Sequence, residues 1–429
     1  MPVLQTKFID DARAVLAAND RGGYTVPTHG LYPFQWNWDS AFVAMGFATF
    51  DIDRGLTELE RLVEGQWDDG MIPHIVFHAP SDTYFPGPEV WGTRHRIPTS
   101  GITQPPVLAI ALADIARRAG SAHRERIVKL YRAAMLNHRW WRSARDPENT
   151  GLVAILHNWE TGRDNSPEWD RPFERVPETT VTAIRRRDTG HVDASMRPRD
   201  IDYRRYIHLV DSYRAAEWNP ARMWRIAPFK VADIGVNAIL LAAEEALLGM
   251  AADFGDRGDA AKIEARIDLI RDGLQKAWNG ARRQFQSRDL IDGERLDILT
   301  SAGFLPLLTD APSSAQVKEM VAALRAIAAS GAMLVPSTAP GEAGFESKRY
   351  WRGPVWAVVN WLIARGLERH GEGTLADAIR RETADGIERA GLCEYFDPIS
   401  REGLGGLGFS WTAAIYLLIA EQGRVKRAA

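Results

Sequence analysis

Apolar residues recur at helical spacing along nearly the whole chain, and this periodicity constrains the fold more than any other feature. It predicts amphipathic helices over residues 8–18, 40–50, 56–64, 106–119, 123–143, 203–217, 234–252, 260–278, 315–329, 355–369, 375–390 and 410–421. Strands do not alternate with these helices, and the one short hairpin that we expect lies near residues 284–291. The chain is therefore predicted to be all-α.

Long connections rich in Gly, Pro and aromatic residues separate the helical pairs, at residues 21–38, 66–104, 152–198 and 338–354. Loops of this length are usually functional or disordered, and their aromatic content favours order. Helical hairpins joined by such loops predict a closed ring of antiparallel helix pairs with the loops at one mouth. An open α-solenoid is the alternative, which the lack of a fixed sequence repeat disfavours.

Charge and cysteine usage exclude several classes of protein. With 53 basic and 56 acidic residues the net charge is −3, which provides no footprint for nucleic acid or an anionic membrane. Cys393 is the single cysteine, so no intrachain disulfide or cysteine-clustered zinc site can form. The N-terminus does not resemble a secretory signal, and the most apolar stretch, residues 239–252, is too short to span a bilayer. We expect a cytoplasmic protein.

Residues 157–170 combine four carboxylates, two tryptophans, two amides and an arginine, with Gly162 and Pro167 interrupting any regular helix. A site that cleaves sugars needs this mixture, because rings stack on pyranoses while carboxyls donate a proton or activate water. We count Trp159 and Asn165 among the sugar-binding candidates. The alternative is an acidic surface loop whose tryptophans fill a helical core, but tryptophans are costly to expose and acids are costly to bury.

A second aromatic tract precedes Asp39 and includes Tyr32, Trp36 and Trp38. We expect Asp39 to hold sugar hydroxyls by charge-assisted hydrogen bonds while the rings stack on the sugar. The alternative is that Asp39 and Ser40 cap the helix that follows, which is the stronger interpretation for Ser40.

The connection over residues 66–104 adds Tyr84 and Gln104, whose amide is suited to a pair of sugar hydroxyls, although Gln104 is equally a turn residue. His74, His78 and His95 lack the spacing of metal ligands, so we expect solvated or packing histidines and no metal.

Arg197 is the candidate partner for an anionic leaving group, since a guanidinium holds a carboxylate through two parallel hydrogen bonds. An ion pair of Arg197 with Asp193 or Asp200 is the alternative. Tyr203 supplies a further hydroxyl.

Three large rings, Tyr350, Trp351 and Trp356, surround Gly353-Pro354, which we expect to start a helix. Such rings are typical of a sugar-binding wall. Core packing is the alternative, above all for Trp356, which the periodicity places inside the helix.

The stretch His-Asn-Trp-Glu-Thr-Gly-Arg-Asp-Asn-Ser-Pro-Glu-Trp-Asp, residues 157–170, resembles the acid-bearing loop of glycoside hydrolase family 63-like enzymes, approximately His-Pro-Trp-Glu-Ser-Gly-x-Asp-Asn-Ser-Pro-x-Trp-Asp. Asn158 replaces the usual proline and Thr161 the usual serine, which leaves the acids in place. The Trp-Asn-Trp-Asp-Ser tract and the closing Glu-Tyr-Phe-Asp-Pro and Phe-Ser-Trp-Thr motifs are also similar, so the resemblance covers nearly the whole chain.

This resemblance implies one (α/α)6-barrel catalytic domain over residues 1–429 that inverts at the sugar and uses no metal or cofactor. Asp164 would be the general acid, kept protonated by its apolar neighbours. Glu394 would be the general base, with Glu402 as a competitor that we disfavour because Tyr395 would help to fix the rotamer of Glu394. Inversion requires the two carboxyls to be roughly 6.5–9.5 Å apart, against about 5–5.5 Å for retention.

The expected substrate is a small α-glycoside of a hydroxy acid, mannosylglycerate or glucosylglycerate, because the chain is short for the family and Arg197 offers a carboxylate anchor. One alternative is an α-glucosidase or trehalase-like hydrolase of a neutral disaccharide. Another is a non-catalytic carbohydrate-binding or solenoid protein. We expect no nucleic-acid or membrane partner, and the aromatic loops would suit a homo-oligomer.

Overall fold

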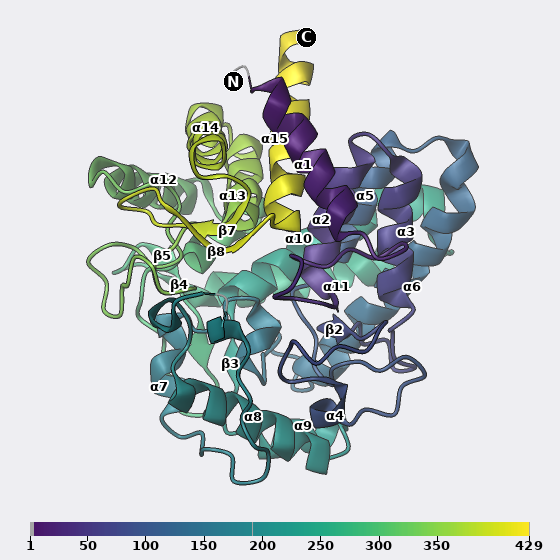
Figure 1. Cartoon of the computed structure of the whole chain (residues 1–429), viewed down its shortest axis with the longest axis vertical. Coiled ribbons are helices and arrows are strands. Elements are labelled where there is room, and N and C mark those ends of the chain that lie inside the picture. The colour runs from purple at the N-terminus through teal and green to yellow at the C-terminus, as the bar shows by residue number, and fades with distance from the viewer. Residues whose placement is uncertain (1–3, 191, 429) are drawn as a thin grey trace.

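Six helical segments contact one another in a closed circle and form the inner wall of the molecule (Figure 1). The computed structural model describes residues 4–190 and 192–428. The inner segments, each in contact with the next, are α2 (Asn37–Ala48), α5 (Leu108–Arg118), α10 (Ile234–Phe254), η6 (Ser301–Leu308), α13 (Ala357–Arg369) and α15 (Ser410–Ala428), which returns to α2. The closure confirms the predicted toroid and excludes an open solenoid.

An outer layer of helices packs on this ring. It comprises α1 (Thr6–Asn19) on α15, α3 (Ile52–Val63) on α2, α6 (Arg124–Arg145) on α5 and α10, α11 (Asp259–Ala277) on α10, and α14 (Gly373–Ala390) on α13; α12 (Ser314–Ala329) follows η6 along the chain. The burial patterns explain the two layers. Every residue of α2 is buried, whereas α3 buries one face that includes Leu56, Leu59 and Leu62. Figure 1 shows α1 beside α15, so the first and last helices of the chain are neighbours.

By length and composition α10 is apolar enough to cross a membrane, yet 78% of its most apolar window is buried inside the protein. Its apolar side chains face the ring and the outer helices, so α10 is the central core helix of the toroid.

One segment of the inner ring, η6, lacks the apolar periodicity of an amphipathic helix. The 3₁₀ helix η6 contains Pro306, and all eight of its residues are buried. A short segment without a 3.6-residue period shows no amphipathic pattern, so the sequence predicted no helix there.

The loops contain four two-stranded antiparallel sheets and several short helices. The sheets pair β1 (Gln35–Trp36) with β2 (Ile75–Val76), β3 (Val231–Ala232) with β6 (Arg288–Asp289), β4 (Trp278–Asn279) with β5 (Gln284–Phe285), and β7 (Cys393–Phe396) with β8 (Gly403–Leu407). The helices are α4 (Pro88–Trp91), α7 (Asp170–Phe173), α8 (Asp200–Ala215), α9 (Pro220–Ile226) and the 3₁₀ turns η1 (Ser121–His123), η2 (Asn158–Thr161), η3 (Pro167–Trp169), η4 (Asp188–Gly190) and η5 (Ala194–Met196). The hairpin predicted near residues 284–291 lies earlier in the chain than expected: β5 pairs with the preceding strand β4, while β6 pairs with the distant strand β3.

Two helix starts differ from the prediction. The N-cap of α2 is Trp36, so Asp39 and Ser40 lie in the first turn and do not cap it. The N-cap of α13 is Trp356, which therefore precedes the helix rather than lying inside it, and Gly353-Pro354 belong to the loop before.

Candidate active site

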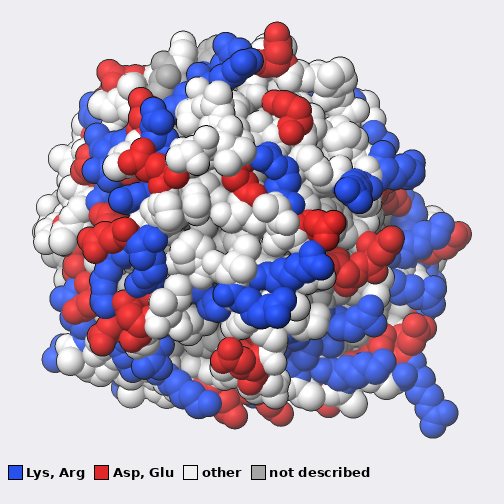
Figure 2. Space-filling model, turned by 90° about the horizontal axis from the view of Figure 1, so that it is seen from below, with Lys and Arg blue, Asp and Glu red and all other residues white. Residues whose placement is uncertain are grey.

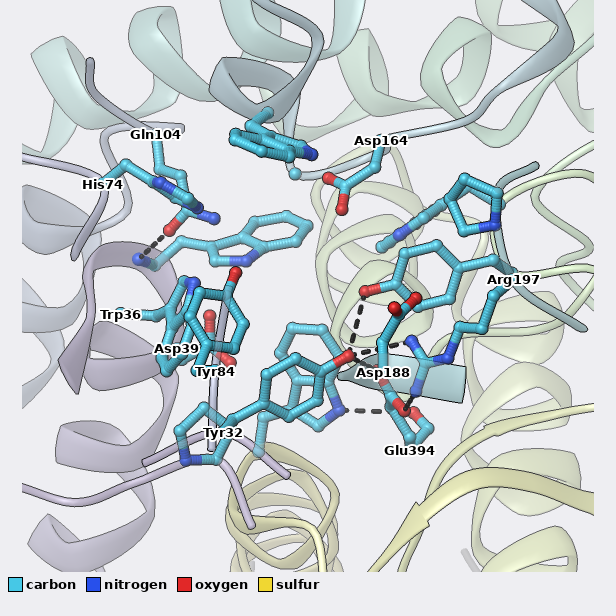
Figure 3. A pocket seen from close by; sticks show the side chains of 18 of the residues that line it. Tyr32, Trp36, Asp39, His74, Tyr84, Gln104, Asp164, Asp188, Arg197 and Glu394 are labelled. Atoms are coloured by element: carbon cyan, nitrogen blue, oxygen red, sulfur yellow. Dashed lines mark hydrogen bonds and ion pairs between the residues drawn. The ribbon is translucent and has the colours of Figure 1, made fainter. Parts of the chain in front are cut away.

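One pocket brings together residues from all four long connections and from the C-terminal motifs (Figure 3). It encloses roughly 720 Å³ including its open mouth. Its lining comprises Pro27, Tyr32, Trp36, Trp38, Asp39, His74, Tyr84, Gln104, Trp159, Gly162, Asp164, Asp188, Arg197, Pro198, Tyr203, Tyr350, Trp351, Glu394, Phe409 and Trp411. Every substrate-binding candidate named from the sequence lines this pocket except Asn165 and Trp356, and so do Asp164 and Glu394.

Three of the four carboxylates of the loop over residues 157–170 are neutralised by arginines. The ion pairs are Glu160 with Arg145 at 2.6 Å, Glu168 with Arg163 at 2.5 Å, and Asp170 with Arg352 at 2.8 Å. Asp164 has no ion pair among the residues that the structure describes, and it lines the pocket. The loop thus presents one carboxyl to a ligand and uses the other three to fix its own shape.

Burial raises the pKa of Asp164 from the ordinary 3.8 to about 7, with Arg197 opposing the rise and Glu394 adding to it. At neutral pH a large fraction of this carboxyl is protonated. A group in that state can donate a proton to a leaving oxygen, which is the role expected of Asp164.

The two residues that depart from the family pattern, Asn158 and Thr161, form hydrogen bonds that fix the backbone at Asp164. Asn158 Nδ2 donates to the main-chain oxygen of Asp164 at 2.7 Å, and Thr161 Oγ donates to the carbonyl of Asn158 at 2.7 Å. Gly162 adopts φ +68°, and a Cβ there would lie 2.4 Å from the Trp38 ring. A glycine at this turn therefore lets the loop close on the aromatic wall.

Glu394 lies on β7, fully buried, and three donors converge on its carboxylate. Arg197 Nη2 and the backbone N–H of Gly406 donate to Oε2, both at 3.0 Å, and the Tyr32 hydroxyl donates to Oε1 at 3.1 Å. Gly405 has φ +75°, and a Cβ there would meet Glu394 Oε2 at 2.4 Å, so only glycine lets β8 approach. This set of donors suits an ionised carboxylate.

Glu402, the competing base, lies outside the pocket. Its side chain is 57% exposed and pairs with Lys348 at 2.7 Å. The glycine-rich segment that follows is the strand β8 rather than a flexible loop, which leaves Glu394 as the glutamate of the pocket.

The partners of Arg197 differ from the alternative considered in the sequence analysis, an ion pair with Asp193 or Asp200. Its Nη1 donates to Tyr32 at 2.8 Å and its Nη2 to Glu394 at 3.0 Å, while the buried Nε has no partner. Asp200 pairs instead with Arg186. The predicted ion pair with Asp193 or Asp200 is therefore wrong. Arg197 is nevertheless the one Lys or Arg that lines the pocket within the described part of the chain.

Asp39 is 7% exposed and points into the same pocket (Figure 3). Burial raises the pKa of Asp39 well above its usual range, and the nearby Glu394 and Asp164 raise it further. We expected a charged carboxylate at this position. A carboxyl with a raised pKa stays protonated to higher pH than usual, and a protonated carboxyl can both donate to and accept from sugar hydroxyls.

The two candidates outside the pocket support its wall from behind. Trp356 stacks on Trp351 with ring centroids 3.8 Å apart and planes within 1°, and its indole N–H donates to the Tyr350 carbonyl. Asn165 Oδ1 accepts from the backbone N–H of Trp351 at 2.9 Å. The expected direct sugar contacts of Trp356 and Asn165 are thus corrected to packing and bracing of Trp351.

Several lining residues were not predicted. His74 is buried and stacks on Trp159 at 6.0 Å, and burial lowers its pKa well below the usual range, so it is neutral. We expected His74 to be a packing or solvated histidine, because nothing in the sequence just before β2 indicated a ligand contact. Phe409 and Trp411 belong to the Phe-Ser-Trp-Thr motif and could have been identified from it. Asp188 follows a run of three arginines, and no motif around it indicated a site residue.

The face of the molecule below α4, α8 and α9 carries basic side chains interspersed with acidic ones (Figure 2). No extended field of one charge sign covers the face shown there.

A helical ring that brings a half-protonated carboxyl and an arginine-held carboxylate into one aromatic-walled pocket has the arrangement of a glycoside hydrolase. Comparison with known proteins specifies the family. The model of the mannosylglycerate hydrolase MGH1-like glycoside hydrolase domain matches residues 32–412.

The relatives extend over nearly the whole chain. A mannosylglycerate hydrolase of Selaginella moellendorffii is 43% identical over 420 residues, covering 96% of this chain and 86% of the relative. A glucosylglycerate hydrolase of Mycolicibacterium hassiacum is 34% identical, covering 96% and 97%. The crystal structure of a family 63 mannosylglycerate hydrolase from Thermus thermophilus with Tris and D-glycerate has a TM-score of 0.91 at 43% identity, covering 96% of this chain and 99% of that one. The chain belongs to the MGH1-like glycosidases of glycoside hydrolase family 63.

Proposed function

We propose that this enzyme hydrolyses the α-glycosidic bond of mannosylglycerate or glucosylglycerate, with inversion, to a hexose and glycerate. The observation that carries the proposal is the pair of carboxyls in different surroundings: Asp164 unpaired with a pKa near 7, and Glu394 held by Arg197 and two further donors. An inverting hydrolase needs one acid and one base in a single pocket.

In the proposed reaction Asp164 donates its proton to the glycosidic oxygen as the bond from that oxygen to the anomeric carbon breaks. Glu394 accepts a proton from a water molecule whose oxygen bonds to the anomeric carbon from the opposite face. Each turnover leaves Asp164 ionised and Glu394 protonated, and exchange with solvent restores both. In Figure 3 the two carboxyls extend into the pocket from different walls, an arrangement that supports these roles.

The proposed hexose site is the half of the pocket formed by Asp39, Gln104 and the indoles of Trp36 and Trp38. Gln104 Oε1 accepts from the backbone N–H of Trp38 at 3.3 Å, which leaves its Nε2 to donate to a hydroxyl. Mixed hydrogen-bonding groups over indole faces suit a pyranose.

The proposed glycerate site is the half formed by Arg197 and the hydroxyls of Tyr32, Tyr84, Tyr203 and Tyr350. Arg197 is the cation of this pocket, and the substrates named for the relatives carry a carboxylate. An anionic leaving group is therefore favoured over a neutral one.

The test is a product assay with mannosylglycerate, glucosylglycerate and trehalose. Release of hexose and glycerate, with the β-anomer appearing first by NMR, supports the proposal. Asp164→Asn and Glu394→Gln should each reduce release by about 10²–10⁴-fold while the circular dichroism spectrum stays unchanged. Faster turnover of trehalose would favour the neutral-disaccharide alternative, and the α-anomer as first product would exclude inversion. Binding without turnover by the unmodified protein would indicate a carbohydrate-binding role.

We further propose that the whole chain works as one catalytic unit in the cytoplasm. The last helix, α15, closes the inner ring on α2 while the first helix packs on α15, and Cys393 is a free, buried thiol. Leu407 and Ile399, 72% and 57% exposed beside the β7–β8 hairpin, support a homo-oligomer, which light scattering would test.

A further inference from the structure

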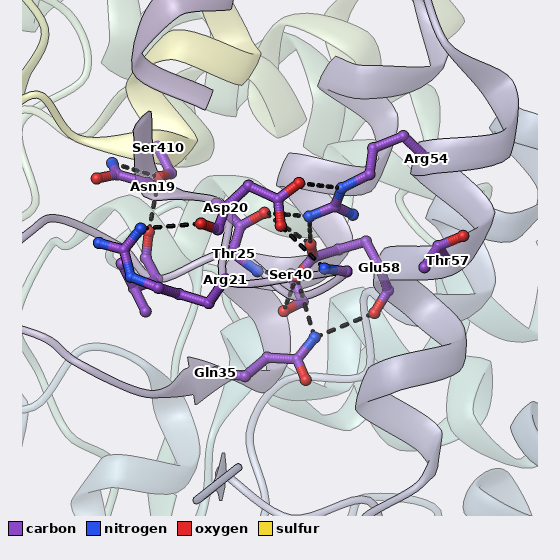
Figure 4. Close-up of polar contacts among 12 residues, drawn as sticks. Asn19, Asp20, Arg21, Thr25, Gln35, Ser40, Arg54, Thr57, Glu58 and Ser410 are labelled. Carbon is purple, nitrogen blue, oxygen red and sulfur yellow. Dashed lines mark hydrogen bonds and ion pairs between the residues drawn. The ribbon is translucent and has the colours of Figure 1, made fainter. Parts of the chain in front are cut away.

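The segment that presents Trp36, Trp38 and Asp39 to the pocket is bonded at both ends to a single carboxylate, that of Glu58 (Figure 4). Gln35 Nε2 donates to Glu58 Oε1 at 3.0 Å, and Ser40 Oγ donates to the same oxygen at 2.8 Å. Glu58 lies on the outer helix α3 and does not line the pocket. A residue of the outer layer thus holds both flanks of the proposed hexose-binding segment.

Glu58 is fully buried and its hydrogen-bonding capacity is filled. Besides Gln35 and Ser40, the backbone N–H of Thr25 donates to Oε1 at 3.2 Å, and Thr25 Oγ1 donates to Oε2 at 2.7 Å. Arg54 Nη2 supplies the counter-charge at 2.9 Å. A buried ion pair adds little net stability compared with apolar packing, so its value here is the geometry that its five donors impose.

Gln35 is fixed from its other side as well. Its Oε1 lies 2.7 Å from His78 Nε2, and burial, with Arg61 nearby, lowers the pKa of His78 to about 4. The imidazole is therefore neutral at pH 7, and because an amide oxygen only accepts, Nε2 carries the proton and donates it. The Gln35 amide consequently has one orientation, with Nε2 toward Glu58 and Oε1 toward His78.

The backbone of the same segment is held by a short sheet. Gln35 pairs with Val76 and Trp36 with Ile75 in β1–β2, and the Asn37 N–H donates to the His74 carbonyl at 3.1 Å. The sheet sets the register of the segment relative to His74, while the Glu58 carboxylate sets its position relative to α3.

We propose that Glu58 is a positioning residue for the hexose half of the pocket, acting through Gln35 and Ser40 on Trp36, Trp38 and Asp39. The inference rests on the proposed function in one respect, that the hexose lies against Asp39. Loss of the Glu58 carboxylate displaces the hexose site and leaves the glycerate site around Arg197 in place.

The test is Glu58→Gln, which keeps the shape but replaces one acceptor oxygen by an NH2 group that faces existing donors. We expect KM for the glycoside and the inhibition constant of free hexose to rise roughly tenfold, the effect of losing hydrogen bonds to a charged group. The inhibition constant of glycerate should not change. The value of kcat should fall less than KM rises, because hexose contacts act on both the ground state and the transition state.

Glu244→Gln is the matched control. Glu244 is also fully buried, pairs with His138 at 3.1 Å and Arg266 at 2.6 Å, and lies on α10 outside the pocket. Both variants should lose thermal stability, but the control should bind hexose normally. Equal weakening of hexose inhibition in the two variants, or an equal loss of glycerate affinity in Glu58→Gln, would overturn the positioning role.

Ser40→Ala provides a second, milder test if Glu58→Gln does not fold. It removes one of the five donors and should weaken hexose binding in the same direction with glycerate binding unchanged; unchanged hexose binding would contradict the proposal. Hexose binding can be read directly from tryptophan fluorescence. The test therefore stands even if glycerate glycosides prove not to be the substrates.

Discussion

The guanidinium of Arg197 lies 3.0 Å from the carboxylate of Glu394, and both side chains are buried and line the pocket. Arg197 thus provides a counter-charge for the carboxylate that we propose as the base, while Asp164, which has no ion pair within the described residues, has its pKa raised by burial. The proposed acid and base differ in their electrostatic surroundings, because Arg197 is closer to Glu394 than to Asp164. Their separate roles follow from their surroundings rather than from their residue types.

The pH dependence of hydrolysis should show a basic limb due to Asp164. Its carboxyl must be protonated to act as the acid, and its pKa is about 7, so kcat/KM should fall as pH rises above 7. A pH profile of kcat/KM measures this limb. In Asp164→Asn the rate should drop by about 10²–10⁴-fold and any residual activity should lose the limb. A basic limb that persists in this variant would assign it to another group.

The same variant should gain stability at high pH. A carboxyl whose pKa rises from 3.8 to about 7 on folding contributes stability below pH 4 that is lost as pH rises through 7. Asp164→Asn removes the cost of burying an ionised carboxyl. At pH 8 the free energy of unfolding of the variant should therefore exceed that of the parent by on the order of a few kcal/mol, which raises its Tm. Near pH 3.5 the two Tm values should match. Scanning calorimetry at the two pH values tests the sign. A lower Tm at pH 8 would mean that Asp164 is stabilised by a partner.

Helical periodicity located the long helices because each repeats an apolar face over several turns. It could not detect η6, which is short and contains Pro306, nor β8, whose glycines leave no alternating pattern. The hairpin predicted near residues 284–291 lies instead at β4–β5, because a two-residue strand carries too little pattern to specify its partner, and β6 pairs with β3, far earlier in the chain.

Residue type identified most of the pocket, since indoles next to Asp and Gly are uncommon in a plain helical core. The pairing of Arg197 with Glu394 could not be predicted from the sequence, because the two residues are 197 positions apart and only the closed ring brings them together. The sequence offered Arg197 nearer acids, Asp193 and Asp200, and local proximity proved misleading. Trp356 failed for a related reason, as a two-residue shift in the start of α13 moved it behind Trp351.

Arg197→Ala should impair hydrolysis in two distinguishable ways. It removes the cation that we assign to the leaving group, so KM should rise for the anionic glycosides. It also leaves Glu394 buried without its counter-charge, so kcat should fall for every substrate. Steady-state kinetics with mannosylglycerate and a neutral aryl mannoside separate the effects. A KM change that is equal for the two substrates would remove Arg197 from the glycerate site and leave it as the partner of Glu394.

The residue before the acid, Arg163, should be among the most sensitive positions for stability. Its guanidinium bonds Glu168 at 2.5 Å and Asp233 at 2.7 Å, all three side chains are buried, and Asp233 Oδ1 caps α10 by accepting from the N–H of Val236. Arg163→Met would leave two buried carboxylates unpaired, and removing one partner of a buried ion pair costs about 3–5 kcal/mol. Denaturant unfolding measures the loss.

Arg352→Met is the matched control for Arg163→Met, because it also breaks an arginine contact of the acid loop, but with the half-exposed Asp170. An exposed pair contributes about 0–1 kcal/mol, so this variant should be far less destabilised. Adding Glu168→Gln and Asp233→Asn to Arg163→Met should recover part of the lost stability, since the uncompensated charges are then removed. Equal destabilisation by Arg163→Met and Arg352→Met would show that burial of the Arg163 cluster does not govern its contribution.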